Sequence, residues 1–385
     1  MPHCHSCLKT RQTPIHRPGQ QAARHQRGFA LLALLTIFVL ALTTVLIARV
    51  SVNEQDSLRQ VNTAGVLAEA AEALVGFALR QQPPGTLPCP DVNGDGLADP
   101  QGSGCQSQRG LLPVRTLGTD ALRDRSGARL WYAVELAYVS NAAGPRNPSR
   151  VPTLELDGLP MASVVIAPNA PFGAQGRAML SVADFLEGEN ANATLNVYAS
   201  LATDAGNDQL LGLSPGPFWT DMARIALAEA GRLLDSYRIA CAEYPWAAAF
   251  GGPYTSVNGL QLGAMPMATA EPFDWGDACP GGTAPLPTSW LVAHWTDQIY
   301  YRMCQMAEGS CLSTIDNSVP PVTGPAASAI LLSPGAPLGA QVRPSSLESN
   351  YFEDQNLAAP DTLFNDLSPI EHDASYNDLT LFLSP

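Results

Sequence analysis

Residues 29–48 form an uncharged apolar run directly after a basic residue and a glycine, and this junction constrains the chain more than any other feature. The run, FALLALLTIFVLALTTVLIA, has twenty residues, which is long enough for one helix to cross the hydrocarbon core of a bilayer. The segment 1–28 before it has no acidic residue, and its basic residues are Lys9, Arg11, Arg17, Arg24 and Arg27. Because basic residues favour the cytoplasmic side, the sequence predicts that everything after Arg49 is exported.

The junction Arg27-Gly28-Phe29, followed by the apolar run, resembles the processing site of type IV prepilins and type II secretion pseudopilins. In those families a peptidase cleaves after the glycine and the new N-terminal residue is methylated, which implies cleavage after Gly28 and methylation of Phe29. The resemblance also implies three partners: other pilin or pseudopilin subunits, the prepilin peptidase and the inner membrane. Most pilins carry Glu at the fifth mature position, which here is Ala33. The tip pseudopilin of type II systems lacks that Glu, so the resemblance favours an end position. An ordinary signal anchor is the alternative.

The helical pattern continues beyond the apolar run. Leu58, Val61, Leu67, Leu74 and Phe77 recur at helical intervals, and the first proline after Phe29 is Pro83. The sequence therefore predicts a helix over 29–82, roughly 80 Å long, whose first half spans the membrane. A membrane span followed by a separate helix, with a break near 51–53, is the alternative.

The exported part contains internal repeats. The segment 170–177 (APFGAQGR) returns as 336–343 (APLGAQVR), and 184–190 (DFLEGEN) returns as 350–356 (NYFEDQN). Segment 207–215 (NDQLLGLSP) resembles 377–385 (NDLTLFLSP), and 67–70 resembles 227–230. These repeats predict two related lobes, each with a helix and a β-rich head.

The expected fold class is α+β, with a long N-terminal helix followed by two related β-rich lobes. We expect a leader over 1–28, the helix over 29–82, a first lobe over 83–215 and a second lobe over 216–385. The apolar runs 162–167, 194–201, 329–332 and 379–383, which have Gly, Pro or Asn near their ends, predict strands.

The charge and the cysteines fit an exported chain. The formal net charge is −14, and an acidic surface of this kind disfavours nucleic acid as a partner. Beyond the leader lie six cysteines, which predict disulfides in an oxidising compartment. Sequence proximity favours Cys89–Cys105 and Cys304–Cys311, which leaves Cys241–Cys279. The expected location is the inner membrane, single-pass, with the head in the periplasm, or on a pilus or the cell surface.

The segment 91–99 matches the first nine positions of an EF-hand-type calcium loop. Its candidate ligands are the side chains of Asp91, Asn93, Asp95 and Asp99 and the carbonyl of Leu97. Position 12 is Gly102 rather than an acid, so a bound Ca²⁺ would be structural and of modest affinity. A plain Asn-Gly/Asp-Gly turn is the alternative.

The repeats keep one Arg and one Glu in each lobe, Arg177 with Glu187 and Arg343 with Glu353. We expect structural ion pairs there rather than a ligand site. The sequence lacks a nucleophile elbow, a phosphate loop and an HExxH motif, so the chain is not expected to be an enzyme. The primary hypothesis is a minor pilin or pseudopilin that joins or caps a filament. The alternatives are a tethered adhesin or binding protein and, third, a signal-anchored periplasmic enzyme.

Overall fold

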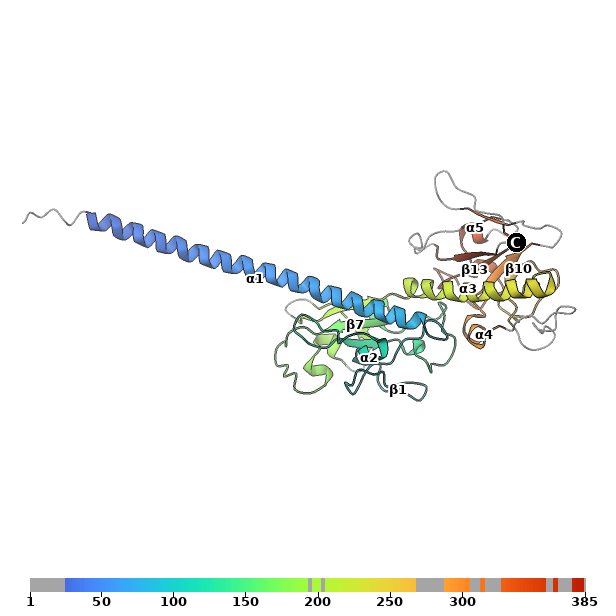
Figure 1. Cartoon of the computed structure of the whole chain (residues 1–385), viewed down its shortest axis with the longest axis horizontal. Coiled ribbons are helices and arrows are strands. Elements are labelled where there is room, and N and C mark those ends of the chain that lie inside the picture. Colours follow the sequence, from blue (N-terminus) through green and yellow to red (C-terminus); the bar gives the residue numbers. More distant parts are fainter. Residues whose placement is uncertain are drawn as a thin grey trace, which may run out of the picture. The chain divides into compact units, whose positions relative to one another are not determined.

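The computed structural model describes residues 25–192, 196–201, 205–267, 287–304, 312–315, 327–357, 363–365 and 376–383. The chain divides into two compact units, Met1–Gln60 and Val61–Pro385. The second unit contains both lobes and all of the sheets (Figure 1).

Helix α1 is assigned to His25–Leu79, with residues in both units. Its side chains are described at Leu32, over 34–43 and from Asn62 onward. In the described part of the chain, no helix is long and apolar enough to cross a membrane. The expected N-terminal helix with a membrane-spanning first half is therefore wrong, because a span needs about 20 consecutive apolar residues, and the described side chains of α1 before Asn62 form a shorter stretch, Leu32 and residues 34–43.

The α+β character of the chain is clear in the first lobe. Its main sheet is antiparallel, with the strand order β3-β4-β7-β9. The strands are β3 (Arg109–Leu111), β4 (Trp131–Val134), β7 (Ser163–Ala167) and β9 (Gln209–Leu213). In one smaller sheet, β1 (Pro100–Gln101) pairs with β2 (Gly104–Cys105). In another, β5 (Glu155–Leu156) lies between β6 (Leu159–Pro160) and β8 (Val197–Tyr198).

The main sheet of the second lobe follows the same plan, with the antiparallel order β10-β11-β13-β15. Its strands are β10 (Leu262–Ala264), β11 (Tyr300–Met303), β13 (Ala329–Ser333) and β15 (Leu379–Leu383). A parallel pair joins β12 (Ser313–Ile315) to β14 (Leu363–Asn365). The strands predicted over 162–167, 329–332 and 379–383 are confirmed by β7, β13 and β15. The shared strand order is what two related lobes would have.

The remaining helices are short apart from α3. They are α2 (Val114–Leu117), α3 (Pro215–Cys241), α4 (Ser289–Trp295) and α5 (Asp354–Leu357), with 3-10 turns at Leu136–Tyr138, Val182–Asp184, Gly188–Ala191 and Glu348–Asn350. Helix α3 begins after Ser214 with proline at its first position, where no backbone N–H is needed. It ends at Cys241, and Ala242 takes a left-handed conformation (φ 61°) that closes the helix.

Side-chain alternation on the central strands places a core on each face of each sheet. In β7, Val165 and Ala167 face one core, whereas Val164 and Ile166 face another. In β13, Leu331 belongs to the same core as Val165, and Ile330 belongs to a separate core of the second lobe. One continuous core, which includes residues of α1 and α3, therefore joins the two lobes.

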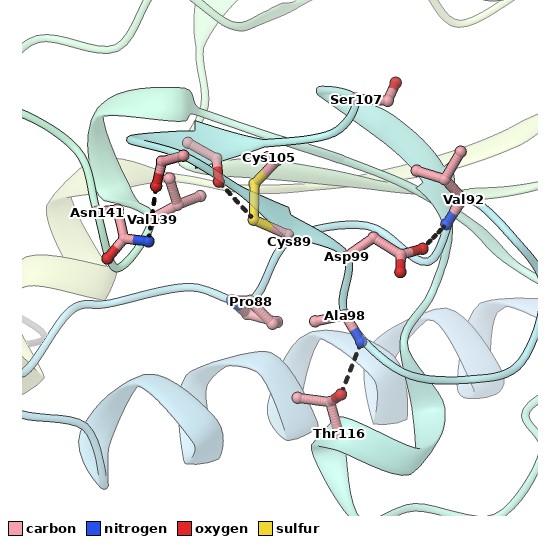
Figure 2. The surroundings of a disulfide bond; sticks show 12 residues. Pro88, Cys89, Val92, Ala98, Asp99, Cys105, Ser107, Thr116, Val139 and Asn141 are labelled. Atoms are coloured by element: carbon pink, nitrogen blue, oxygen red, sulfur yellow. Dashed lines mark hydrogen bonds between the residues drawn. A yellow bond between two sulfur atoms is a disulfide. The ribbon is translucent and has the colours of Figure 1, made fainter.

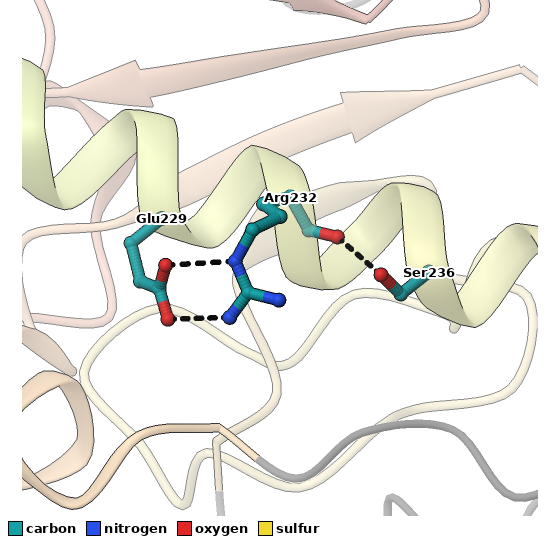
Figure 3. Close-up of polar contacts among 3 residues, drawn as sticks. All are labelled: Glu229, Arg232 and Ser236. Carbon is teal, nitrogen blue, oxygen red and sulfur yellow. Dashed lines mark hydrogen bonds and ion pairs between the residues drawn. The ribbon is translucent and has the colours of Figure 1, made fainter.

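Helix α3 packs against β13 and β15 of the second lobe (Figure 1). Another side of α3 carries polar contacts among its own residues. Arg232 donates two hydrogen bonds to the Glu229 carboxylate, at 2.9 and 2.7 Å, and the Ser236 hydroxyl donates to the Arg232 carbonyl at 2.8 Å (Figure 3). Residues spaced three apart on a helix lie on the same side of it, and the side with Glu229 and Arg232 lies beside Ser289 and Trp290 at the start of α4.

Candidate functional site

The described apolar side chains near the start of α1 are exposed. Eight large ones have exposed fractions from 51% to 70%: Leu32, Leu34, Leu35, Ile37, Phe38, Val39, Leu40 and Leu42. Successive residues of an α-helix point about 100° apart, so neighbours such as Ile37, Phe38 and Val39 cover different sides of the helix. We call this set of eight residues the apolar collar. A helix that is apolar on all sides is normally buried.

Gly28 and Phe29, the expected processing site, fall inside the assigned bounds of α1. Nothing is described of their side chains. Processing there stays a prediction.

The predicted calcium loop is closed by a disulfide between Cys89 and Cys105, whose Cα atoms lie 5.3 Å apart (Figure 2). This pairing agrees with the one that sequence proximity favours. Two further contacts hold the same segment: the Ala98 N–H donates to the Thr116 hydroxyl (2.8 Å), and the Asn141 side chain donates to the Gly102 carbonyl (3.0 Å). Cys241 and Cys304 are also disulfide-bonded. Cys279 and Cys311, their expected partners, lie outside the described residues.

Inside the loop, the side-chain oxygens accept hydrogen bonds from the loop's own backbone. Asp91 is buried, and its two oxygens accept from the N–H groups of Gly94 (2.6 Å) and Gly96 (2.8 Å). Asp99 accepts from Val92 at 2.7 Å (Figure 2), and Asp95 accepts from its neighbour Leu97 at 2.8 Å. Such turns organise a loop without a ligand.

Two arginines donate to carbonyls of the same loop. Arg129 donates to the Gly94 carbonyl (2.8 Å) and Arg115 to the Asp95 carbonyl (3.1 Å). They line a hollow of about 360 Å³ together with Asp91 and Asp95. Among the described residues, no three His, Cys, Asp or Glu side chains are grouped so as to hold a metal ion. The calcium site therefore stays a prediction.

The Arg and Glu repeated in the two lobes belong to matching networks that include a glutamine. In the first lobe, Arg177 donates to the Gln175 side-chain oxygen (3.1 Å), and the Gln175 amide donates to Glu187 (2.7 Å). In the second lobe the corresponding distances are 2.7 Å for Arg343 to Gln341 and 2.6 Å for Gln341 to Glu353. The arginine and the glutamate of each lobe are thus linked through an amide.

Each arginine also caps the turn that precedes it. Arg177 donates to the Pro168 carbonyl (3.2 Å), and Arg343 donates to the Pro334 carbonyl (3.3 Å). The Arg177 guanidinium lies 4.7 Å from the centre of the Phe185 ring, a distance at which a cation and an aromatic face attract. These contacts support a structural role for both arginines.

Each glutamate faces a buried aspartate that the sequence analysis did not single out. Glu187 and Asp208 are joined reciprocally: the Glu187 N–H donates to Asp208 (3.0 Å), and the Asp208 N–H donates to Glu187 (3.2 Å). Burial and the neighbouring Glu187 raise the pKa of Asp208 to about 8. In the second lobe, burial and the charge of Glu353 likewise raise the pKa of Asp378. In both pairs, burial beside a second carboxylate therefore favours the protonated form of the aspartate.

The repeats already held the signal for these aspartates. Gln175 and Gln341 occupy equivalent places in the first repeated segment, and Asp208 and Asp378 do so in the third. Their contact could not be read from the sequence, since Glu187 and Asp208 lie 21 residues apart.

We expect Asp208→Asn to make stability less dependent on pH. The folded pKa of Asp208, about 8, lies above its ordinary value of 3.8, so the folded state keeps a proton that the unfolded chain releases. The stabilisation is present below pH 4 and is lost as the pH rises toward 8. An amide mimics the protonated acid, so the variant should exceed the wild type in unfolding free energy at pH 8. Urea denaturation from pH 5 to 9 measures this, with the exposed Asp120→Asn as control. An unchanged slope in Asp208→Asn would contradict the raised pKa of Asp208.

His294, the histidine at the end of α4, contacts Arg146 of the first lobe. Both nitrogens of the His294 ring face Arg146. The backbone nitrogen of Arg146 lies 3.3 Å from Nδ1 of the ring, and the guanidinium Nη2 of Arg146 lies 3.1 Å from Nε2. Burial, together with the Arg146 charge, lowers the pKa of His294. Arginine stays protonated and offers only hydrogen-bond donors, so the imidazole ring is the acceptor in this pairing.

Comparison with known proteins gave no match to a protein-family model, to a curated protein or to a solved structure.

Proposed function

We propose that this chain is a non-enzymatic minor pilin or pseudopilin that incorporates into, or caps, a type IV pilus or a type II secretion pseudopilus. The observation that carries the proposal is the apolar collar, whose eight large side chains are all more than half exposed. Burying one Leu or Ile side chain contributes about 1.5–3 kcal/mol. Helices of neighbouring subunits would supply the apolar surroundings that this segment lacks in the single chain.

The proposal includes processing between Gly28 and Phe29 by a prepilin peptidase. It also includes an inner-membrane location before assembly and a head in the periplasm. The basic segment before Gly28, which has no acidic residue, supports this orientation. The Cys89–Cys105 disulfide supports an oxidising compartment for the head.

A tethered binding protein is the second candidate, and one cavity favours it. A hollow of about 420 Å³ lies between the start of α3 and two turns of the second lobe, and Pro217, Trp219, Leu338 and Leu379 are among its lining residues. A mostly apolar hollow of this size is typical of ligand pockets. A binding role would leave function intact when the apolar collar is altered, whereas a filament role would not.

The filament role can be tested with Ile37→Asp. Ile37 lies in the apolar collar and is 66% exposed, so the change should leave the head folded. It should abolish incorporation, because a carboxylate would be buried among apolar helices. Immunoblotting of sheared or pelleted filaments measures incorporation.

The matched control is Ile239→Asp, which alters an isoleucine of α3 that is 78% exposed and should incorporate normally. Wild-type levels of Ile37→Asp in filaments would overturn the proposal.

We also propose a structural calcium ion in the Asp91–Asp99 loop. Asp91, Asn93, Asp95 and Asp99 would supply side-chain oxygens and Leu97 its carbonyl, which is the oxygen-rich set that Ca²⁺ prefers. Calcium should raise the melting temperature of the head, and Asp95→Ala should remove that rise while Asp120→Ala keeps it. Calorimetry in EDTA and in millimolar calcium measures the shift. No shift in the wild type would mean that the backbone contacts alone hold the loop.

A further inference from the structure

The two lobes are joined by a cluster of hydrogen bonds around His294, in which Arg146 and Asn147 are buried. A loop of the first lobe, Arg146–Ser149, reaches the end of α4 in the second. The Asn147 side chain donates to the His294 carbonyl (2.7 Å) and to the Asp297 carboxylate (2.8 Å), and the Ser149 hydroxyl donates to Asp297 (3.3 Å). Arg146, which is buried, faces the His294 ring and also donates to the Val139 carbonyl at 3.1 Å.

An aromatic cluster also joins the lobes. Trp219 of α3 packs edge-on against Tyr138 of the first lobe, with ring centres 5.0 Å apart, and against Trp295 of α4 at 6.1 Å. The Trp219 indole N–H donates to the Tyr138 hydroxyl at 3.3 Å. All three rings are buried, so opening the lobes would expose a large apolar surface.

The contact between Arg146 and His294 requires a neutral imidazole ring. Both donors of Arg146 need an acceptor, and a neutral imidazole offers one nitrogen lone pair, with the tautomer deciding which donor it serves. An imidazolium offers none and would place a second positive charge beside the Arg146 guanidinium. Burial and Arg146 both favour the neutral ring.

We propose that this cluster is an acid-sensitive latch between the lobes, which protonation of His294 releases. The inference does not depend on filament assembly. The residues around His294 lie outside the apolar collar. They would respond to acidity in the pH range where histidine is the side chain that ordinarily titrates.

Other charged and titratable groups lie near the latch, and Asp297 responds to acid in the opposite sense to His294. Burial raises the pKa of Asp297. As the pH falls toward the ordinary pKa of an aspartate, protonation of Asp297 therefore favours the closed state. This effect opposes the opening that protonation of His294 causes. Among the described residues, Arg343 and Tyr254 lie near Asp297, and Glu229 and Arg232 lie beside Ser289 and Trp290 at the other end of α4.

The size of the expected response follows from linkage. While the closed state keeps the ring neutral, each pH unit below about 6.5 favours opening roughly tenfold. Lowering the pH from 7.5 to 5.5 should therefore raise the opening equilibrium by about tenfold.

Hydrogen exchange with mass spectrometry on the purified chain tests the latch. After correction for the intrinsic pH dependence of exchange, peptides covering 142–150 and 289–297 should exchange about tenfold faster at pH 5.5 than at pH 7.5. His294→Gln keeps a neutral acceptor and should remove this difference, while matching the wild type at pH 7.5. Asp297→Asn should keep the acid response, since it leaves His294 in place.

His372→Gln changes the other histidine of residues 29–385 and serves as a control that should behave as wild type. The proposal is overturned if the wild type shows no acceleration, if the acceleration persists in His294→Gln, or if His372→Gln removes it.

Discussion

Trp219→Ala should lower the unfolding free energy of the head by about 3–5 kcal/mol, the cost typical of removing a large buried aromatic side chain. Trp219 is 2% exposed and contacts the rings of Tyr138, Phe218 and Trp295. Its ring also lies against the backbone at Gly85, where an added Cβ would come within 2.3 Å of it. The indole of Trp219 therefore packs between three chain segments, those of Gly85, Tyr138 and Trp295. A neighbouring side chain could fill the space left by the indole only by giving up its own contacts.

Urea denaturation followed by circular dichroism measures the effect. Trp290→Ala is the matched control, because Trp290 is a partly buried tryptophan at the start of α4 and should cost much less. A loss below about 1 kcal/mol for Trp219→Ala would show that the two lobes do not share a core.

Removal of the Cys89–Cys105 disulfide, as Cys89→Ser with Cys105→Ser, should cost about 3 kcal/mol, because cross-links over loops of this length stabilise mainly by restricting the unfolded chain. The bond closes a loop with a sequence separation of 16. The comparison is made by urea denaturation in EDTA, so that no calcium contributes.

Asn141→Ala is the control for the disulfide. It removes another tether of the same segment, the 3.0 Å hydrogen bond to the Gly102 carbonyl, and should cost about 1 kcal/mol. If the double serine variant costs no more than Asn141→Ala, the disulfide does not hold this part of the fold.

The sequence predicted those parts of the fold that depend on local patterns. Strands β7, β13 and β15 could be located because each is a short apolar run bounded by turn residues. The Cys89–Cys105 pair could be expected because the two cysteines lie close together in the sequence. The two lobes were expected from repeated segments, and the equivalent networks around Gln175 and Gln341 fit that expectation.

The sequence could not predict contacts that the chain makes over long separations. The latch joins Arg146 to His294 across 148 residues, and no local pattern marks either residue. In the Asp91–Asp99 loop, the spacing of the oxygens was visible, but their hydrogen bonds to Gly94 and Gly96 were not. The membrane-spanning helix was a wrong expectation, since no helix in the described part of the chain is long and apolar enough to cross a membrane.

Processing as a prepilin is the step on which the proposed function depends, and mass spectrometry of the mature N-terminus tests it. The chain should be isolated from cells with and without the prepilin peptidase. We expect a chain that begins with N-methylated Phe29 when the peptidase is present, and a chain that retains residues 1–28 when it is absent. An unprocessed N-terminus in the presence of the peptidase, or cleavage at any other position, would contradict the proposed function.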